Sequence, residues 1–146
     1  MKITIALVAI AGLAAIAPIH STLRAEQATS RSVLDGVYTE EQAKRGDMLY
    51  GQDCASCHGP SLMGTEMAPP LTGATFMMNW NDATVGELFE KIRLGMPADD
   101  PGSLNPQQTA DVLSHILKVG KFPVGQTELG TDAQALRQMK IEPLKP

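Results

Sequence analysis

The feature that most limits what this chain can fold into is a pentapeptide, Cys54-Ala55-Ser56-Cys57-His58, which holds both cysteines of the 146 residues. Cysteines three positions apart lie on one side of a helical turn, where their thiols can add to the two vinyl groups at one porphyrin edge. The next residue then places its imidazole under the iron as an axial ligand. The pattern therefore predicts one covalently bound c-type haem, held by Cys54, Cys57 and His58.

Three other uses of these residues stay open. A redox-active dithiol normally accompanies a βαβ pattern, which this sequence lacks. A structural zinc ion takes four ligands, and beyond its N-terminal segment the chain offers only Cys54, Cys57, His58 and His115. A disulfide between the two cysteines would close a small strained loop and leave His58 without a role. Haem accounts for the whole pentapeptide and is the preferred hypothesis.

The N-terminus has the pattern of a secretory signal. Lys2 precedes an apolar run over residues 3–19, and a short polar stretch then leads to Ala25, a small residue suited to cleavage. Residues 1–25 are therefore predicted to be a signal peptide that exports the protein to an oxidising compartment. The apolar run is at the lower length limit for a membrane span, so an uncleaved membrane anchor is the alternative.

Charge and composition exclude one class of partner and favour a prosthetic group. Lys and Arg number 12 against 16 Asp and Glu, and cleavage after Ala25 would remove Lys2 and Arg24 as well. No basic face for gripping nucleic acid is expected. Aromatic residues make up only 4% of the chain. A prosthetic group with its own apolar surface would compensate for the thin core that this composition implies.

Three stretches combine a capping signal at their start with apolar residues at helical spacing. They are residues 39–53, opened by Thr39 and Gln42, residues 84–95, opened by Thr84 and Glu87, and residues 105–120, opened by Asn105 and Pro106. No segment of strand length alternates apolar and polar residues. An all-α fold is therefore expected.

The remaining segments are predicted from their lack of such patterns. Residues 26–38 are mostly polar and without period, which indicates a flexible leader. Residues 59–81 are rich in glycine, proline and methionine and are predicted to be a long functional loop. Residues 39–124 then form the domain, and the C-terminal tail, residues 125–146, packs on it through apolar positions. Those positions are Leu129, Leu136, Met139 and Ile141.

Two further motifs follow the pentapeptide, Pro69-Pro70-Leu71-Thr72-Gly73 and Gly95-Met96-Pro97. With them the chain resembles the monohaem class I c-type cytochromes from about Glu41 to Ile141. The motifs are similar to the P-x-L-x-G segment and the distal methionine loop of that family, in the family's order. The stretches 101–104, 110–113, 116–117 and 122–123 look particularly like small periplasmic cytochromes that serve quinoprotein-type dehydrogenases.

The resemblance implies a cytochrome c-like helical domain around one haem, in which the first and last helices cross closely. Gly46 fits such a crossing because it lacks a side chain, and His115 would pack there. The implied function is that of a periplasmic electron carrier, not an enzyme. It would pass one electron at a time from a periplasmic dehydrogenase to an oxidase or another cytochrome. The carrier would be a monomer or a dehydrogenase subunit, and would meet a membrane only if the signal stayed uncleaved.

The resemblance also implies a distal methionine ligand to the iron, for which Met96 is the preferred candidate. It follows a helix-ending glycine, and Pro97 restricts its backbone to extended conformations. A distal His115, or a vacant position open to peroxide or gases as in a haem enzyme or sensor, are the alternatives. The weaker methionine candidates are Met63, which barely has the reach, and Met67, Met77 and Met78.

Other residues are expected around the haem. By resemblance, the Pro69 carbonyl accepts the free ring N–H of His58 and so fixes the ring. Trp80, the one tryptophan, either meets a haem propionate or is simply buried. Candidates for the pocket wall, each with an ordinary core role as the alternative, are Tyr50, Leu71, Phe76, Phe89 and Leu113. Candidates for a local basic docking patch are Lys91, Arg93, Lys118 and Lys121.

Overall fold

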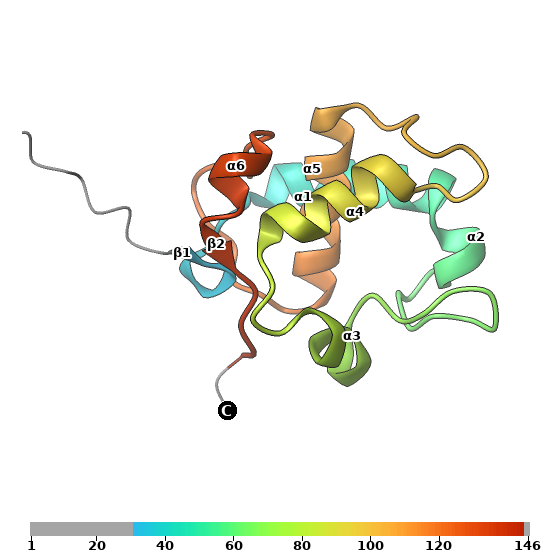
Figure 1. The fold of residues 1–146 in the computed structure, drawn as a ribbon, viewed down its shortest axis with the longest axis horizontal. Helices are drawn as coiled ribbons and strands as arrows, with labels where there is room; N and C mark the ends of the chain where they lie inside the picture. Colours follow the sequence, from blue (N-terminus) through green and yellow to red (C-terminus); the bar gives the residue numbers. More distant parts are fainter. Residues whose placement is uncertain (1–30, 145–146) are drawn as a thin grey trace, which may run out of the picture.

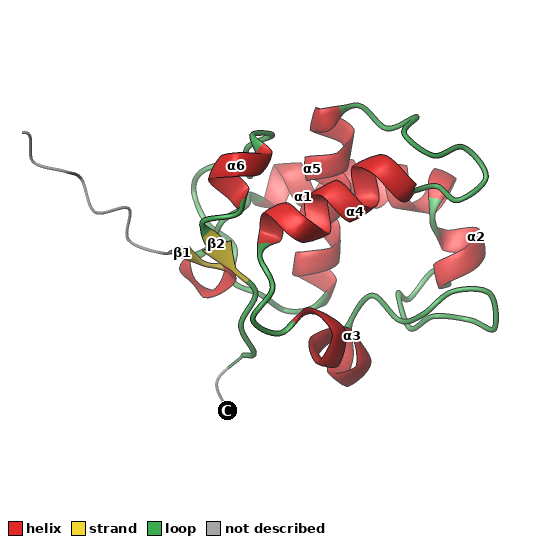
Figure 2. Ribbon diagram, in the orientation of Figure 1, coloured by secondary structure: helices red, strands yellow, loops and turns green. Residues whose placement is uncertain are grey.

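The computed structural model describes residues 31–144, which form a helical domain with one very short strand pair (Figure 1). The elements are β1 (Arg31–Ser32), the 3-10 helix η1 (Val33–Asp35), α1 (Glu40–Asp53), α2 (Ala55–His58), α3 (Gly73–Trp80), α4 (Val85–Gly95), α5 (Pro106–Val119), α6 (Ala133–Leu136) and β2 (Met139–Lys140). Figure 2 shows that the regular secondary structure of this domain is almost entirely helical, which confirms the predicted all-α class. None of the helices in this range is long and apolar enough to cross a membrane. The predicted signal peptide, residues 1–25, lies outside the described residues.

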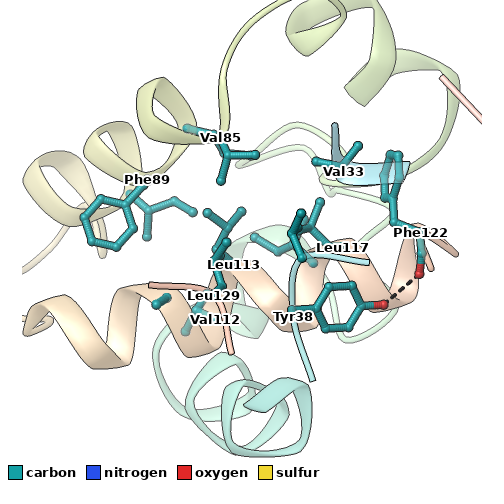
Figure 3. Packing of buried hydrophobic residues seen from close by; sticks show 14 of the residues in the cluster. Val33, Tyr38, Val85, Phe89, Val112, Leu113, Leu117, Phe122 and Leu129 are labelled. Atoms are coloured by element: carbon teal, nitrogen blue, oxygen red, sulfur yellow. Dashed lines mark hydrogen bonds between the residues drawn. The ribbon is translucent and has the colours of Figure 1, made fainter. Parts of the chain in front are cut away.

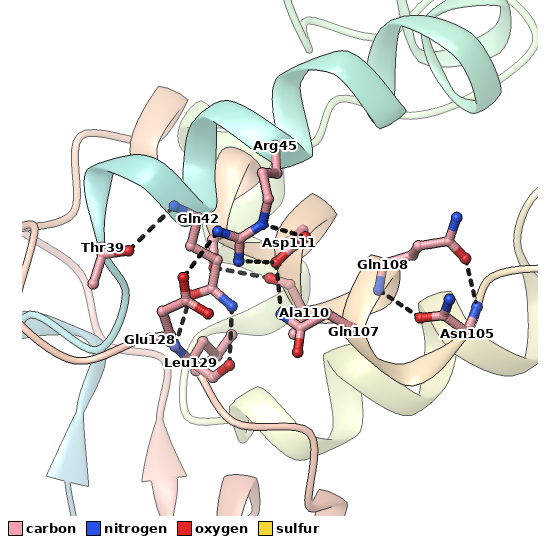
Figure 4. Close-up of polar contacts among 11 residues, drawn as sticks. Thr39, Gln42, Arg45, Asn105, Gln107, Gln108, Ala110, Asp111, Glu128 and Leu129 are labelled. Atoms are coloured by element: carbon pink, nitrogen blue, oxygen red, sulfur yellow. Dashed lines mark hydrogen bonds and ion pairs between the residues drawn. The ribbon is translucent and has the colours of Figure 1, made fainter.

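Helices α4 and α5 begin where side chains cap them. Thr84 Oγ1 accepts a hydrogen bond from the Glu87 backbone N–H, and the Glu87 carboxylate accepts one from the Thr84 N–H. The predicted capping box of α4 is therefore complete. Asn105 and Gln108 form the same reciprocal pair ahead of α5 (Figure 4). These contacts satisfy backbone N–H groups that the first turn of a helix leaves unpaired.

The capping box predicted for α1 is only half formed, so this prediction is corrected. Thr39 Oγ1 accepts from the Gln42 backbone N–H at 3.1 Å, but the Gln42 side chain turns into the core. There its amide donates to the Leu129 carbonyl at 3.0 Å, and its oxygen accepts from the Leu129 N–H at 2.6 Å (Figure 4). Gln42 therefore ties α1 to the C-terminal tail instead of closing the cap.

Replacement of Gln42 by leucine is expected to lower the free energy of unfolding by about 2–4 kcal/mol, because both polar groups of the buried Leu129 backbone lose their partner. Thr39→Ala is the control, since it removes only the cap and should cost about 1 kcal/mol. Denaturant unfolding of the haem-loaded protein measures both losses. Equally small losses in the two variants would show that the contacts to Leu129 contribute little.

Helices α1 and α5 make the most extensive contact between elements and cross beside a residue without a side chain. A Cβ atom on Gly46 would lie 1.8 Å from the backbone oxygen of Asp111 and 3.0 Å from the His115 Cβ. The crossing expected between these two helices is therefore present, and glycine permits it. On its other side, α5 faces α4 through one buried cluster that includes Leu113 and Val85 (Figure 3).

Residues 31–38 are part of the folded domain, which corrects the prediction of a flexible leader over residues 26–38. β1 pairs in parallel with β2 from the C-terminal tail. Val33 and Tyr38 are fully buried, and the Tyr38 hydroxyl donates to the Phe122 carbonyl at 2.7 Å (Figure 3). Single apolar residues in a polar stretch have no periodicity, so the sequence pattern did not reveal that they complete the core.

Helix α3 interrupts residues 59–81, so the prediction of one continuous loop is wrong. Phe76 and Trp80 lie one turn apart on α3 with ring centroids 6.4 Å apart, and Phe76 is buried. This inward face holds the helix against the domain. With only eight residues, α3 is too short to produce a clear helical period in the sequence.

The C-terminal segment adds α6 and β2 to the domain. Leu129, Leu136 and Ile141 are buried in the common core. Helix α6 lies against α4 (Figure 1). A Cβ atom on Gly86 would lie 2.7 Å from the Ala133 carbonyl oxygen, so glycine at this point of α4 allows α6 its close approach.

Candidate haem-binding site

The predicted site residues meet around one cleft of about 280 Å³. Its lining comes from the pentapeptide, the irregular segment after it, the end of α3, α4 and the loop that follows, and α5. The lining residues are Cys54, Cys57, His58, Met67, Ala68, Pro69, Pro70, Leu71, Asn79, Trp80, Leu88, Lys91, Ile92, Met96, Ala98, Val112 and Ile116. All four predicted haem-binding residues are among them, together with Pro69 and Trp80.

The two cysteines present unbridged thiols to the cleft from a single helical turn. The backbone N–H groups of Cys57 and His58 both donate to the Cys54 carbonyl, which winds the pentapeptide into that turn. Burial, and after it the nearby Asp53 and Cys57, raise the pKa of the Cys54 thiol to about 11. Such a thiol stays protonated at neutral pH, whereas a redox-active dithiol needs a lowered pKa.

The four residues that a zinc site would need are not brought together. Among residues 31–144, no group of three or more His, Cys, Asp or Glu side chains is placed to hold a metal ion. His115 lies at the crossing of α1 and α5 and is not part of the cleft lining. The position of His115 also removes it as a distal ligand in this cleft.

The His58 ring is fixed by one hydrogen bond. Its Nδ1 lies 2.8 Å from the carbonyl oxygen of Pro69. A carbonyl can only accept, so Nδ1 carries the hydrogen and donates it, and Nε2 keeps a free lone pair. His58 is 8% exposed, and its own carbonyl accepts from the Gly64 N–H at 2.9 Å. A ring held in one orientation and one tautomer is suited to ligate iron.

Met96 reaches the same cleft from the end of α4. It caps that helix with φ −129° and ψ 149°, the extended backbone expected before Pro97. Its side chain is half-buried and packs against the core. Met67 also lines the cleft, but it is 70% exposed. The methionine candidates that do not line the cleft are Met63, Met77 and Met78.

Most of the wall comes from residues that sequence reasoning placed in the core. Of the predicted wall residues only Leu71 lines the cleft. Tyr50, Phe76, Phe89 and Leu113 are buried in the protein core. The wall is instead built by apolar residues of α4 and α5, namely Leu88, Ile92, Val112 and Ile116. Helical spacing marks these four as inward-facing, but it looks the same whether the face packs against protein or against a porphyrin.

The charged residues near the cleft are mixed in sign. Lys91 is the one predicted patch residue that lines it. Lys118 pairs with Glu40 across the α1–α5 crossing. Two exposed acidic residues are adjacent in the chain to residues that line the cleft. Glu66 directly precedes Met67, and Asp99 directly follows Ala98. The expected basic docking patch is therefore offset by acidic neighbours.

The donor set and the lining fit a covalently attached haem. The two thiols can bond to its vinyl edge, and the imidazole beside them has a free Nε2 for the iron. The apolar side chains of α4 and α5 suit the apolar face of the porphyrin, and the thioether of Met96 offers a second axial donor.

A solved structure, the sulfane dehydrogenase SoxCD from Paracoccus pantotrophus, is similar with a TM-score of 0.45 and 21% sequence identity. The similarity covers 56% of this chain and 44% of that one, so it spans less than half of the relative's length. Among curated proteins, none matches the chain significantly.

The family comparison covers the cleft itself. Residues 41–116 match the family described as cytochrome C oxidase, cbb3-type, subunit III. This range is more than half of the chain and includes both the pentapeptide and Met96. The protein thus belongs to that family of c-type cytochromes, and it is an electron-transfer protein with haem c as its cofactor.

Proposed function

We propose that this cytochrome works in the periplasm, with His58 and Met96 as the two axial ligands of its haem iron. It takes single electrons from a dehydrogenase and passes them to an oxidase or another cytochrome. The observation that carries the proposal is that one cleft is lined both by the pentapeptide and by Met96 at the end of α4. The bound haem supplies the one-electron exchange, and the chain sets the potential and excludes other reactions.

The two axial side chains decide which chemistry the site allows. His58 offers the free lone pair of Nε2, because Nδ1 is engaged by Pro69. Met96 offers a thioether sulfur from the C-terminal end of α4. Ligation by both side chains would close the site to peroxide and gases, and this would separate an electron carrier from a haem enzyme or sensor. A thioether ligand also favours the reduced state and raises the reduction potential.

The wall of the cleft also favours a higher reduction potential. Leu88, Ile92, Val112 and Ile116 are all buried residues of two packed helices. Apolar surroundings exclude water and disfavour the extra positive charge of an oxidised haem. The sequence thus combines an axial ligand and a dry wall that both favour a carrier of relatively high potential.

The location and the donor rest on the sequence. The secretory pattern of residues 1–25 supports export, and the mass of the mature N-terminus checks it. The resemblance to cytochromes that serve quinoprotein-type dehydrogenases supports the donor, and reduction by such a purified dehydrogenase checks it. A stable complex during purification would identify a fixed subunit, whereas a lone monomer would identify a diffusing shuttle.

Substitution of Met96 by alanine is expected to keep the haem attached and to open one axial position. The oxidised variant should lose the weak far-red absorption that marks sulfur ligation, and it should bind cyanide and carbon monoxide. Its reduction potential should fall, because the thioether no longer favours the reduced state. Optical spectra and potentiometry of the haem-loaded variant measure these changes.

Met67→Ala is the matched control, since Met67 lines the same cleft but is 70% exposed. Its far-red absorption and its resistance to cyanide should equal those of the wild type. If the far-red absorption survived in Met96→Ala and vanished in Met67→Ala, Met67 would be the ligand. If the wild type lacked the far-red absorption and bound cyanide readily, the distal position would be open. The hypothesis of a haem enzyme or sensor would then replace that of an electron carrier.

A further inference from the structure

A buried histidine outside the cleft is connected to the segment that carries His58. His115 on α5 is 7% exposed and lies at the crossing with α1. The centroid of its ring is 5.2 Å from that of Tyr50 on α1. The Tyr50 hydroxyl donates a 2.7 Å hydrogen bond to the carbonyl of Gly59, the residue directly after His58. These contacts form a buried path from His115 to the iron-binding histidine.

The His115 ring has a partner for its charged form at the protein surface. Its Nε2 lies 3.7 Å from a carboxylate oxygen of Asp47, whose side chain is 70% exposed. Burial lowers the pKa of His115 below its ordinary value of 6.5, against the opposing effect of Asp47. The ring therefore takes up a proton only at a lower pH than an ordinary histidine does.

The other charged groups around His115 on both helices are already engaged. Asp111, one turn earlier on α5, accepts two hydrogen bonds of 2.9 Å from the Arg45 guanidinium of α1 (Figure 4). Lys118, on α5, lowers the pKa of His115 but pairs with Glu40. Asp47 remains as the carboxylate that can pair with the protonated ring.

Few other groups near this path titrate in the same range. Burial raises the pKa of Tyr50 to about 12, so its phenol stays neutral throughout. The chain has three histidines, and within residues 31–144 His115 is the one besides the ligand His58. Besides these described residues, the propionates of the bound haem can titrate near neutral pH.

We propose that His115 is a proton-linked positioning residue, so that reduction of the haem is accompanied by proton uptake on its ring. One electron enters from the donor protein, and one proton from water binds the ring beside Asp47. This proton adds a positive charge to α5, the helix whose Val112 and Ile116 line the cleft, and that charge favours the reduced state. By linkage, reduction must in turn strengthen the binding of the proton. The proposal needs the covalent haem and His58, but it does not need Met96 as a ligand.

The expected signature is a reduction potential with two plateaus. The higher plateau lies on the acid side, where His115 is protonated in both redox states, and the lower one lies where it is neutral in both. Each tenfold difference in proton affinity between the two states separates the plateaus by about 59 mV for a one-electron couple. The step falls below the ordinary histidine pKa of 6.5.

The test is the potential of the haem-loaded protein as a function of pH, from about pH 4 to pH 8. In His115→Phe, which keeps an aromatic ring against Tyr50, the step is expected to disappear. In Asp47→Asn, the step is expected to move to lower pH, because the charged ring loses its carboxylate partner. Tyr50→Phe removes the contact with Gly59 and should shrink the step while His115 still titrates.

A second readout keeps the proposal testable if His115→Phe fails to fold. Nuclear magnetic resonance of the wild type reports the pKa of the His115 ring directly in the reduced and the oxidised protein. A higher pKa in the reduced protein supports the proposal, and equal values overturn it. A full step that survives in His115→Phe also overturns it and assigns the titration to the propionates. Neither result depends on how Met96→Ala behaves.

Discussion

Replacement of Gly46 by alanine is expected to lower the free energy of unfolding by about 3 kcal/mol or more, a large loss for one added methyl group. The new Cβ would lie 1.8 Å from the backbone oxygen of Asp111. A backbone atom inside α5 cannot rotate away as a flexible side chain would, so α1 and α5 must move apart. Their contact is the most extensive in the domain and holds His115 against α1.

Gly51→Ala on the same helix is the matched control. Nothing lies within 4 Å of a Cβ atom at Gly51, and the position is exposed. This variant should gain about 0.5–1 kcal/mol, because alanine favours helix over glycine. Urea unfolding of both haem-loaded variants in one buffer gives the two changes with opposite signs. A stabilising effect at Gly46 as well would mean that the two helices are not held at this distance.

The long helices could be predicted because their signals are local. The capping box of Thr84 and Glu87 sets the start of α4, and Asn105 with Pro106 sets the start of α5. Side chains that cap a helix act within three residues, so one short window of sequence contains the whole interaction. The role predicted for Gln42 from its local sequence was wrong, because its partner Leu129 lies 87 residues away in the chain.

The segments that were missed depend on contacts across the chain. Tyr38 is buried in the common core, where the Phe122 carbonyl, 84 residues further on, accepts a hydrogen bond from its hydroxyl. α3 is held by the burial of Phe76 and not by any strong helix signal of its own. A polar stretch with a few apolar residues and a Gly-rich segment both carry little period, so tertiary packing decides their structure.

In the candidate site, too, the local features could be predicted and those that depend on tertiary packing could not. The pentapeptide carries its chemistry within five residues, and the contact of His58 with Pro69 followed from the resemblance and is present at 2.8 Å. The wall could not be predicted, because Ile92 and Val112 belong to ordinary apolar helix faces. Gly95 and Pro97 already favoured Met96 over Met67 in the sequence, and the greater burial of Met96, which the sequence alone does not contain, supports the same choice.

Substitution of His58 by alanine is expected to remove the native haem spectrum altogether. The variant loses the one imidazole that the described residues place in the cleft lining, and the Pro69 carbonyl loses its donor. Cys54→Ala and Cys57→Ala should instead damage attachment, because each leaves a single thioether link to the porphyrin. Haem staining on a denaturing gel measures attachment, and the spectrum of the native protein measures ligation.

The two readouts separate the roles of neighbouring residues in one helical turn. Ser56→Ala is the control, since Ser56 is exposed within the pentapeptide and carries no predicted contact with the haem. It should match the wild type in both measurements. His58→Ala should fail in the spectrum even where some haem remains covalently bound, and the cysteine variants should fail first in the stain. A wild-type spectrum in His58→Ala would place the proximal ligand on another residue and would remove the basis for the path from His115 through Tyr50.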